Sequence, residues 1–311
     1  MLRTTALGLL ASAILPVGAA GQANPADTVT ITTVPVTPGL SMLVGPGGNI
    51  LVSVGADGVF VIDDELVQLS KRTTAAIAAI SDRPVRFLVN THWHGDHTGG
   101  NEALGSTGAV IVAHANVRKR LSVDQFMERF KQTVPALPHV ALPVITFDST
   151  VWLHLNGDSI LVQHLSNAHT DGDAVVRFLK ANVVHMGDTY MNHMYPFIDI
   201  FSGGSIDGVI RAVDAMLPFV DERTKIIPGH GALSNRQEMI AYRDILKTIR
   251  GRVARMIDQG KTLEQIVAAK PTAEWDEGWT TSFVNGTQLV RFIHESLLAS
   301  RKMRGKPRQA H

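Results

Sequence analysis

Residues 92–97 read His-Trp-His-Gly-Asp-His and so place three histidines and an aspartate within six positions. They follow an apolar segment at 84–89 of strand type, and a helix can begin at Asp96, so the histidines fall at a strand-to-helix junction. Imidazole is the commonest metal ligand among side chains. The segment therefore predicts a metal site, and a polar turn with chance histidines is the poorer interpretation.

The spacing within this segment predicts two groups of ligands. Alternate residues of an extended loop point to the same side, so we expect His92, His94 and Asp96 to converge and His97 to face away from them. One loop can then supply ligands to two metal ions. The chain has no cysteine, which excludes disulfides and thiolate ligands, and the metals must be held by nitrogen and oxygen.

The N-terminal 23 residues have the pattern of a secretory signal peptide: one positive charge at Arg3, an apolar run, and small residues before position 23. The apolar run is too short to span a membrane. We therefore expect an exported, periplasmic protein whose mature part, residues 24–311, is a single catalytic domain without stable membrane insertion.

The composition favours a globular protein that acts on a small molecule. The 311 residues are 45% hydrophobic, which supports a substantial core. Lysine and arginine number 29 against 28 acidic residues, and no dominant basic block indicates a nucleic-acid or anionic-membrane partner. The composition does not predict the oligomeric state.

The order of expected elements predicts an α+β domain of two sheets covered by helices. Short apolar segments separated by glycine-rich turns predict strands at 29–32, 40–44, 49–54, 59–62, 85–89, 109–113, 151–155, 159–165, 174–178, 183–186 and 224–227. Helical spacing of apolar residues predicts helices at 66–81, 116–132, 205–220, 235–259, 263–269 and 288–302.

Three of the later expected strands also end in potential ligands. His169 lies in the turn-like segment 167–173, Asp188 follows the strand at 183–186, and His230 lies between two glycines after the strand at 224–227. Asp63 and Asp64 end an early strand, where they could orient the back of the histidine loop or simply form a turn.

With these motifs in order, the chain resembles the metallo-β-lactamase-fold superfamily, whose signature is a His-x-His-x-Asp-His loop followed by His, Asp and His at later strand ends. The resemblance implies a four-layer αββα sandwich, here with extra C-terminal helices. It also implies that the first metal is held by His92, His94 and His169, the second by Asp96, His97 and His230, and that Asp188 bridges the two.

The resemblance implies two zinc ions, with iron as an alternative, that activate a shared water for attack on a carbonyl. Asp96 is the candidate catalytic residue because it can also orient the nucleophile. Candidate substrate contacts are residues beside the ligands: Trp93, Tyr190, His193 and Tyr195.

Two differences from the β-lactamase pattern narrow the choice of branch within this superfamily. The β-lactamase subclass with a cysteine at the second metal is excluded, since Asp188 stands there, and the lysine that often follows has no counterpart at 189–193. The full His/Asp set is similar to the glyoxalase II and lactonase branches, although an exported protein is poorly placed for cytosolic glutathione thioesters. We expect an exported hydrolase in which a metal-bound hydroxide opens an amide or ester, with β-lactams and lactones as leading substrates. The alternatives are an iron-dependent oxidoreductase of this fold and a metal-binding accessory protein of a periplasmic redox or sulfur system.

Overall fold

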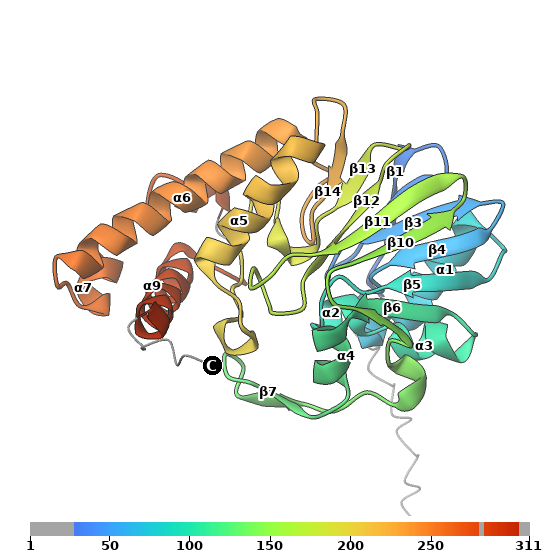
Figure 1. Ribbon diagram of the computed structural model, residues 1–311, viewed down its shortest axis with the longest axis horizontal. Coiled ribbons are helices and arrows are strands. Elements are labelled where there is room, and N and C mark those ends of the chain that lie inside the picture. The colour runs from blue at the N-terminus through green and yellow to red at the C-terminus, as the bar shows by residue number, and fades with distance from the viewer. Residues whose placement is uncertain (1–27, 280–282, 305–311) are drawn as a thin grey trace, which may run out of the picture.

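The computed structural model describes residues 28–279 and 283–304, and its centre is a pair of β-sheets that pack face to face (Figure 1). The predicted signal peptide at 1–23 lies outside the described residues. The first sheet has the strand order β1-β2-β3-β4-β5-β6-β9, antiparallel from β1 to β4 and parallel from β4 onward. Its strands are β1 (Thr32–Thr37), β2 (Leu40–Val44), β3 (Ile50–Gly55), β4 (Gly58–Ile62), β5 (Val85–Val89), β6 (Val110–His114) and β9 (Ile145–Phe147).

The second sheet has five strands in chain order. Only its last pair is parallel, and the rest are antiparallel. The strands are β10 (Thr150–Leu155), β11 (Asp158–His164), β12 (Ala174–Phe178), β13 (Val183–His185) and β14 (Lys225–Ile227).

Side-chain alternation along the strands assigns residues to the layers. In β4, Phe60 and Ile62 pack between the two sheets, whereas Val59 and Val61 face the helices on the outer side. Phe60 meets Phe178 of the second sheet, with ring centroids 6.0 Å apart. Because both faces of this strand are buried, all five of its residues are apolar or glycine.

Helices cover both outer faces, which confirms the expected αββα sandwich with extra C-terminal helices (Figure 1). Ile77 of α1 (Ser70–Ile80) and Leu104 of α3 (Asn101–Ser106) pack on the first sheet. A larger helical layer packs on the second sheet through α5 (Ile206–Met216), α6 (Arg236–Asp258) and α9 (Gly286–Arg304). The remaining short helices are η2 (Val67–Leu69), α2 (Gly95–Thr98), α4 (Ala115–Leu121), η3 (His139–Ala141), η4 (Gly187–Thr189), η5 (Ile200–Ser202), η6 (Leu217–Phe219), α7 (Leu263–Ala268) and α8 (Asp276–Trp279).

The expected helix at 116–132 is wrong beyond Leu121. The α4 helix ends there, and the chain continues as a small hairpin of β7 (Gln125–Met127) and β8 (Gln132–Val134). Arg129 of the hairpin donates to the Phe283 carbonyl and the Phe130 ring stacks on that of Phe283, so contacts with the C-terminal layer override local helix propensity here. The first strand also lies at 32–37 rather than 29–32.

The strand ends place the predicted ligands at one rim of the sandwich. The histidine loop leaves β5, His169 follows β11, Asp188 lies in η4 directly after β13, and His230 follows β14. Among the described residues, no helix is both long and apolar enough to cross a membrane.

Candidate metal centre

The histidine loop separates into an extended half and a helical half. His94 is extended with φ −65° and ψ 148°, and the following residues form the single turn of α2. The helical turn reverses the expected alternation: Asp96 points to the same group as His97, and the His97 ring lies 4.2 Å from the His92 ring. The expectation that Asp96 joins His92 and His94 while His97 faces away is therefore wrong, because it assumed extended backbone throughout.

The described residues contain three clusters of side chains whose ligand atoms all lie within 4.8 Å of one another. They are His92 with His94 and His169, His92 with His97 and Asp188, and Asp96 with His97 and His230. In the first cluster, His94 Nδ1 lies 2.8 Å from His169 Nε2. In the third, His230 Nε2 lies 3.3 Å from Asp96 Oδ2 and 3.4 Å from His97 Nε2.

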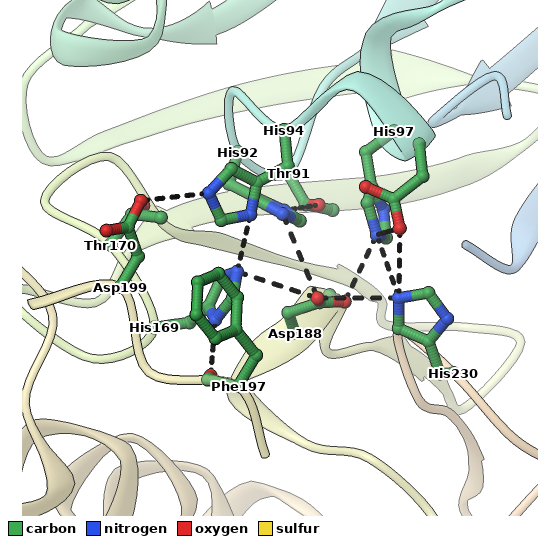
Figure 2. A network of polar contacts seen from close by, with 12 residues as sticks. Thr91, His92, His94, His97, His169, Thr170, Asp188, Phe197, Asp199 and His230 are labelled. Carbon is green, nitrogen blue, oxygen red and sulfur yellow. Dashed lines mark hydrogen bonds and ion pairs between the residues drawn. The ribbon is translucent and has the colours of Figure 1, made fainter. Parts of the chain in front are cut away.

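Asp188 lies between the clusters and contacts both (Figure 2). Its Oδ2 atom is 3.5 Å from His169 Nε2 and 3.4 Å from His230 Nε2. Its Oδ1 atom is 3.1 Å from His97 Nε2. Burial alone would raise the pKa of this carboxyl, but the neighbouring His230 and His97 hold it well below its ordinary value, so Asp188 is an anion.

Asp63 supports the back of the loop, in the orienting role that the sequence left open for it. This fully buried carboxylate accepts hydrogen bonds from Thr91 N (2.7 Å), Thr91 Oγ1 (2.8 Å) and His97 Nδ1 (2.8 Å). Because the Nδ1 proton of His97 is engaged there, the lone pair of its Nε2 points to the cluster. Asp64 accepts instead from Gly100 N, and among the described residues its side chain forms no hydrogen bond with a histidine ring.

Two further partners orient the other rings, and sequence reasoning did not find them. His94 Nε2 donates to Asp199 Oδ2 (3.0 Å), and His169 Nδ1 donates to the Phe197 carbonyl (2.8 Å). Asp199 lies 105 residues after His94, so no local pattern connects the two. Every residue has a backbone carbonyl, so the sequence does not mark the one at Phe197 as a partner.

Two glycines allow the clusters to close. A Cβ atom on Gly229 would lie 2.0 Å from Asp188 Oδ1, and one on Gly48 would lie 2.2 Å from His97 Cε1. Real Cβ atoms do not approach other atoms this closely, so both positions need glycine. In the Gly-His-Gly motif, His230 is the predicted ligand and Gly229 is required by the close packing against Asp188.

The protonation states fit a site for cations. Burial lowers the pKa of His92 well below its ordinary value and that of His169 to about 4, so both rings are neutral and can donate a lone pair. Burial also acts to lower the pKa of His97 and His230, but Asp188 and Asp96 outweigh it and raise both, the latter to about 10. The carboxylates thus stabilise positive charge between the rings, whether protons or metal ions.

Two buried atoms of the ligand set, His92 Nε2 and Asp188 Oδ1, have no hydrogen-bond partner among the described residues. The other ring nitrogen of His92, Nδ1, lies 3.1 Å from Thr91 Oγ1. A buried polar atom without a partner is costly and calls for an explanation. These two atoms, the neutral rings and the set of nitrogen and oxygen donors fit a dinuclear metal site.

The four candidate substrate contacts lie in different surroundings. Tyr190 is buried, and its hydroxyl contacts Ser234 Oγ (2.7 Å) and donates to Asn192 Oδ1 (2.9 Å). The Tyr195 hydroxyl donates to Asp276 Oδ1 (3.0 Å). Both hydroxyl groups therefore bond to neighbouring protein groups and not to the ligand clusters, and their role as substrate contacts stays a prediction.

Trp93 and His193 flank the site without entering the ligand clusters. Trp93 is buried in a core cluster with Val117 and Leu142, and its ring lies 4.8 Å from the His94 ring. His193 is exposed, and its ring lies 6.2 Å from that of Trp279. The most open side of the cluster is formed by Asp96 and His230, whose side chains are 30% and 20% exposed.

Comparison with known proteins adds a family match and several relatives. A family profile described as the metallo-beta-lactamase superfamily matches residues 34–230, a range that includes all seven predicted ligands. A hydroxyacylglutathione hydrolase from Polaromonas sp. is 26% identical over 180 residues, which cover 57% of this chain and 60% of that protein. Another from Nitrosococcus oceani is 30% identical over 119 residues, covering 34% of this chain and 45% of that protein. The chain thus spans less than two thirds of the length of these curated relatives.

Solved structures share the fold at low identity. The stereoselective inverting sec-alkylsulfatase Pisa1 from Pseudomonas sp. has a TM-score of 0.65 at 15% identity, covering 89% of this chain and 52% of that chain. A metallo-β-lactamase from Pontibacter korlensis has a TM-score of 0.57 at 16% identity, covering 70% of this chain and 99% of that chain.

Proposed function

Since this chain belongs to the metallo-β-lactamase superfamily, we propose that it is an exported hydrolase that holds two zinc ions and opens the carbonyl of an ester, lactone or β-lactam. The predicted signal peptide supports export to the periplasm. The hydrolase class is supported by the names of the relatives.

One observation carries the proposal: Asp188 contacts histidines of both groups with its two oxygens. A structural zinc needs four ligands in a closed site, whereas this centre offers seven, arranged around one shared carboxylate. Such an arrangement is suited to two ions about 3.5–4 Å apart. A single structural ion would leave several of these buried groups without a role.

The ligand assignment follows from which ring nitrogens are free. His92 Nε2, His94 Nδ1 and His169 Nε2 would hold the first ion, because the opposite nitrogens of the last two donate to Asp199 and Phe197. The second ion would be held by Asp96, His97 and His230, with Asp188 between the two ions.

Zinc bound here would supply Lewis acidity and lower the pKa of a water molecule toward neutrality. The chain's own residues set the conditions for that chemistry. Asp188 reduces the repulsion between two cations, and Asp63 and Asp199 hold the rings of His97 and His94 in place. Asp96 presents a carboxylate at the open side, where it can orient the nucleophile toward a carbonyl.

The substrate class is supported by a ligand set of histidines and aspartates without cysteine. Nitrogen and oxygen ligands with Asp188 at the shared position suit carbonyl hydrolysis, and a lactone or β-lactam needs no glutathione in the periplasm. The hydroxyacylglutathione hydrolases among the relatives make a thioester the necessary comparison substrate.

The test combines metal content with a substrate panel. The purified mature protein, loaded with zinc, is assayed with nitrocefin, an acyl-homoserine lactone, a simple ester and a thioester. Asp188→Asn should lower both bound metal and turnover, because the amide cannot neutralise two cations. Asp171→Asn is the matched control, since this carboxylate lies in the His169 loop but pairs with Arg120 at 2.7 Å.

The outcomes separate the alternatives. Turnover of one class that falls with metal content in the Asp188 variant supports the proposal. Iron in the protein as isolated, with no hydrolysis of any substrate, would favour an iron-dependent oxidoreductase. Two bound zinc ions with no turnover at all would favour an accessory metal-binding protein.

A further inference from the structure

A cavity of about 330 Å³ adjoins the metal centre on the His94 side. It lies between the β7–β8 hairpin, the η5 segment and α9, and its lining includes Arg129, Phe197, Asp199 and Phe292. This volume is within the range of small-molecule pockets. None of the predicted ligands lines it, so the cavity is a site of its own.

Phe197 separates the cavity from the metal centre. Its ring lies 5.7 Å from both the His94 and the His169 ring on one side, and 5.5 Å from the Phe292 ring on the other. Figure 2 shows this ring beside His169. Asp199, the partner of His94, also lines the cavity. A molecule in the cavity would therefore lie next to the residues that hold the first metal.

Arg129 of the hairpin reaches into a set of aromatic rings. Its guanidinium carbon lies 5.2–5.6 Å from the ring centroids of four phenylalanines, Phe130, Phe197, Phe283 and Phe292. One Nη donates to the Phe283 carbonyl (2.6 Å). The Nε–H group is buried and has no hydrogen-bond partner among the described residues. Burial also lowers the pKa of this arginine, as expected for a cation withdrawn from water.

The other charges of the cavity have partners or lie at its exposed rim. Glu128 pairs with Lys131, and Asp199 pairs with His94. Arg291 and Glu295 are exposed and lie four residues apart on α9. Within the described part of the chain, neither Arg129 nor Arg291 forms an ion pair with a carboxylate, and of the two Arg129 is the one that lies among aromatic rings.

A guanidinium without a carboxylate partner, beside the rings of Phe197 and Phe292 in the cavity lining, suits an anion that carries an apolar group. The rings favour an apolar chain, and the guanidinium offers planar donors to a carboxylate or sulfate. We propose that this cavity binds an organic anion with an apolar chain, and that Arg129 recognises the anionic group. This site goes beyond the proposed function, because the Phe197 ring lies between the cavity and the metal centre.

The test measures binding without hydrolysis. Calorimetry with the metal-loaded protein compares octanoate, octyl sulfate and octanol, which share a chain and differ in the head group. We expect both anions to bind and octanol to bind more weakly. Arg129→Gln should weaken the anions by about tenfold and leave octanol within about twofold, because a charge-assisted hydrogen bond contributes on that order.

Arg177→Gln is the matched control. Arg177 is also partly buried and lies over a phenylalanine ring, that of Phe219 at 4.1 Å, but it does not line the cavity. It should change none of the affinities. Arg129→Lys keeps the charge and should recover part of the anion affinity, which separates recognition from a purely structural role of the hairpin.

The outcomes distinguish this inference from the proposed function. Equal binding of octanol and octanoate, or an equal loss of both in Arg129→Gln, would overturn the inference even in an active hydrolase. Anion binding that depends on Arg129 in a protein that hydrolyses nothing would retain the site and overturn the hydrolase proposal.

Discussion

Replacing Asp63 by asparagine should weaken one of the two metal sites more than the other. The carboxylate accepts three hydrogen bonds, from Thr91 N, Thr91 Oγ1 and His97 Nδ1. An amide has one acceptor oxygen, so in either orientation its NH₂ group faces at least one of these buried donors. The negative charge behind His97 is also lost.

The magnitude follows from these contacts. A buried hydrogen bond to a charged group contributes about 1.5–3 kcal/mol, which corresponds to roughly tenfold to a hundredfold in affinity. Loss of an orienting partner of a metal-bound histidine has an effect of the same size. The ion held through His97 should therefore bind about 10–100 times more weakly. The ion at His92, His94 and His169 should be weakened less, because Asp63 reaches that site only through Thr91 and His92, while Asp199 and the Phe197 carbonyl orient the other two rings.

The measurement is a zinc titration of the metal-free protein against a chromophoric chelator, which resolves two affinities. Asp64→Asn is the control: this neighbouring carboxyl is equally buried, and burial raises its pKa well above the ordinary value, so an amide is a close substitute. The reasoning is refuted if Asp63→Asn retains both affinities, if it loses the His94 site instead, or if Asp64→Asn has the same effect.

Three further predictions concern the packing at Gly229, the pH dependence of stability and the hydroxyl group of Tyr190. Gly229→Ala should lower bound metal and activity, because its Cβ would lie 2.0 Å from Asp188 Oδ1. Gly95→Ala is the control, since its Cβ would have no atom within 4 Å, and it should leave metal content and activity intact. Equal metal content in the two variants would contradict this prediction. Acidification through pH 6.5 should lower the melting temperature, since burial and the His164 ring stacked at 3.8 Å depress the pKa of His114. The stability that neutral His114 contributes is present above the ordinary pKa of histidine and is lost as the pH falls through the depressed pKa of the folded protein. A proton on Nδ1 of His114 would also face the N–H group of Asn116, which donates to that nitrogen. His114→Asn should therefore flatten the dependence of the melting temperature on pH. Tyr190→Phe should lower the free energy of unfolding by about 1 kcal/mol in urea denaturation and leave turnover unchanged; a large loss of turnover would support the predicted role of this residue as a substrate contact.

Local signals in the sequence predicted the two sheets and placed potential ligands at strand ends, and the resemblance to the metallo-β-lactamase fold implied the αββα sandwich and the grouping of seven residues into one centre. Alternating apolar residues in strands such as β4 identify the sheets, and each expected ligand lies within a few residues of a strand end. Since strand ends meet at a rim, residues as distant as His92 and His230 can be expected together. Asp63 was accessible to the same reasoning because it too ends a strand.

Features that depend on side-chain direction or long-range contacts were not predictable. The turn of α2 places Asp96 beside His97, and no spacing rule for an extended loop gives this result. Tyr190 follows Asp188 by two positions but points to Ser234, which only the packing of the C-terminal layer determines. Asp199 and Arg129 act through partners far along the chain. The β7–β8 hairpin forms against that layer instead of continuing as a helix.

The central claim is that two metal ions act together in this centre. Zinc titration of the metal-free protein, with turnover of the best substrate followed at each addition, tests it most directly. Activity should rise to its maximum at two equivalents per chain, and Asp188→Asn should bind fewer ions and not reach that maximum. Full activity at one equivalent, or activity that persists in the metal-free protein, would contradict the dinuclear account.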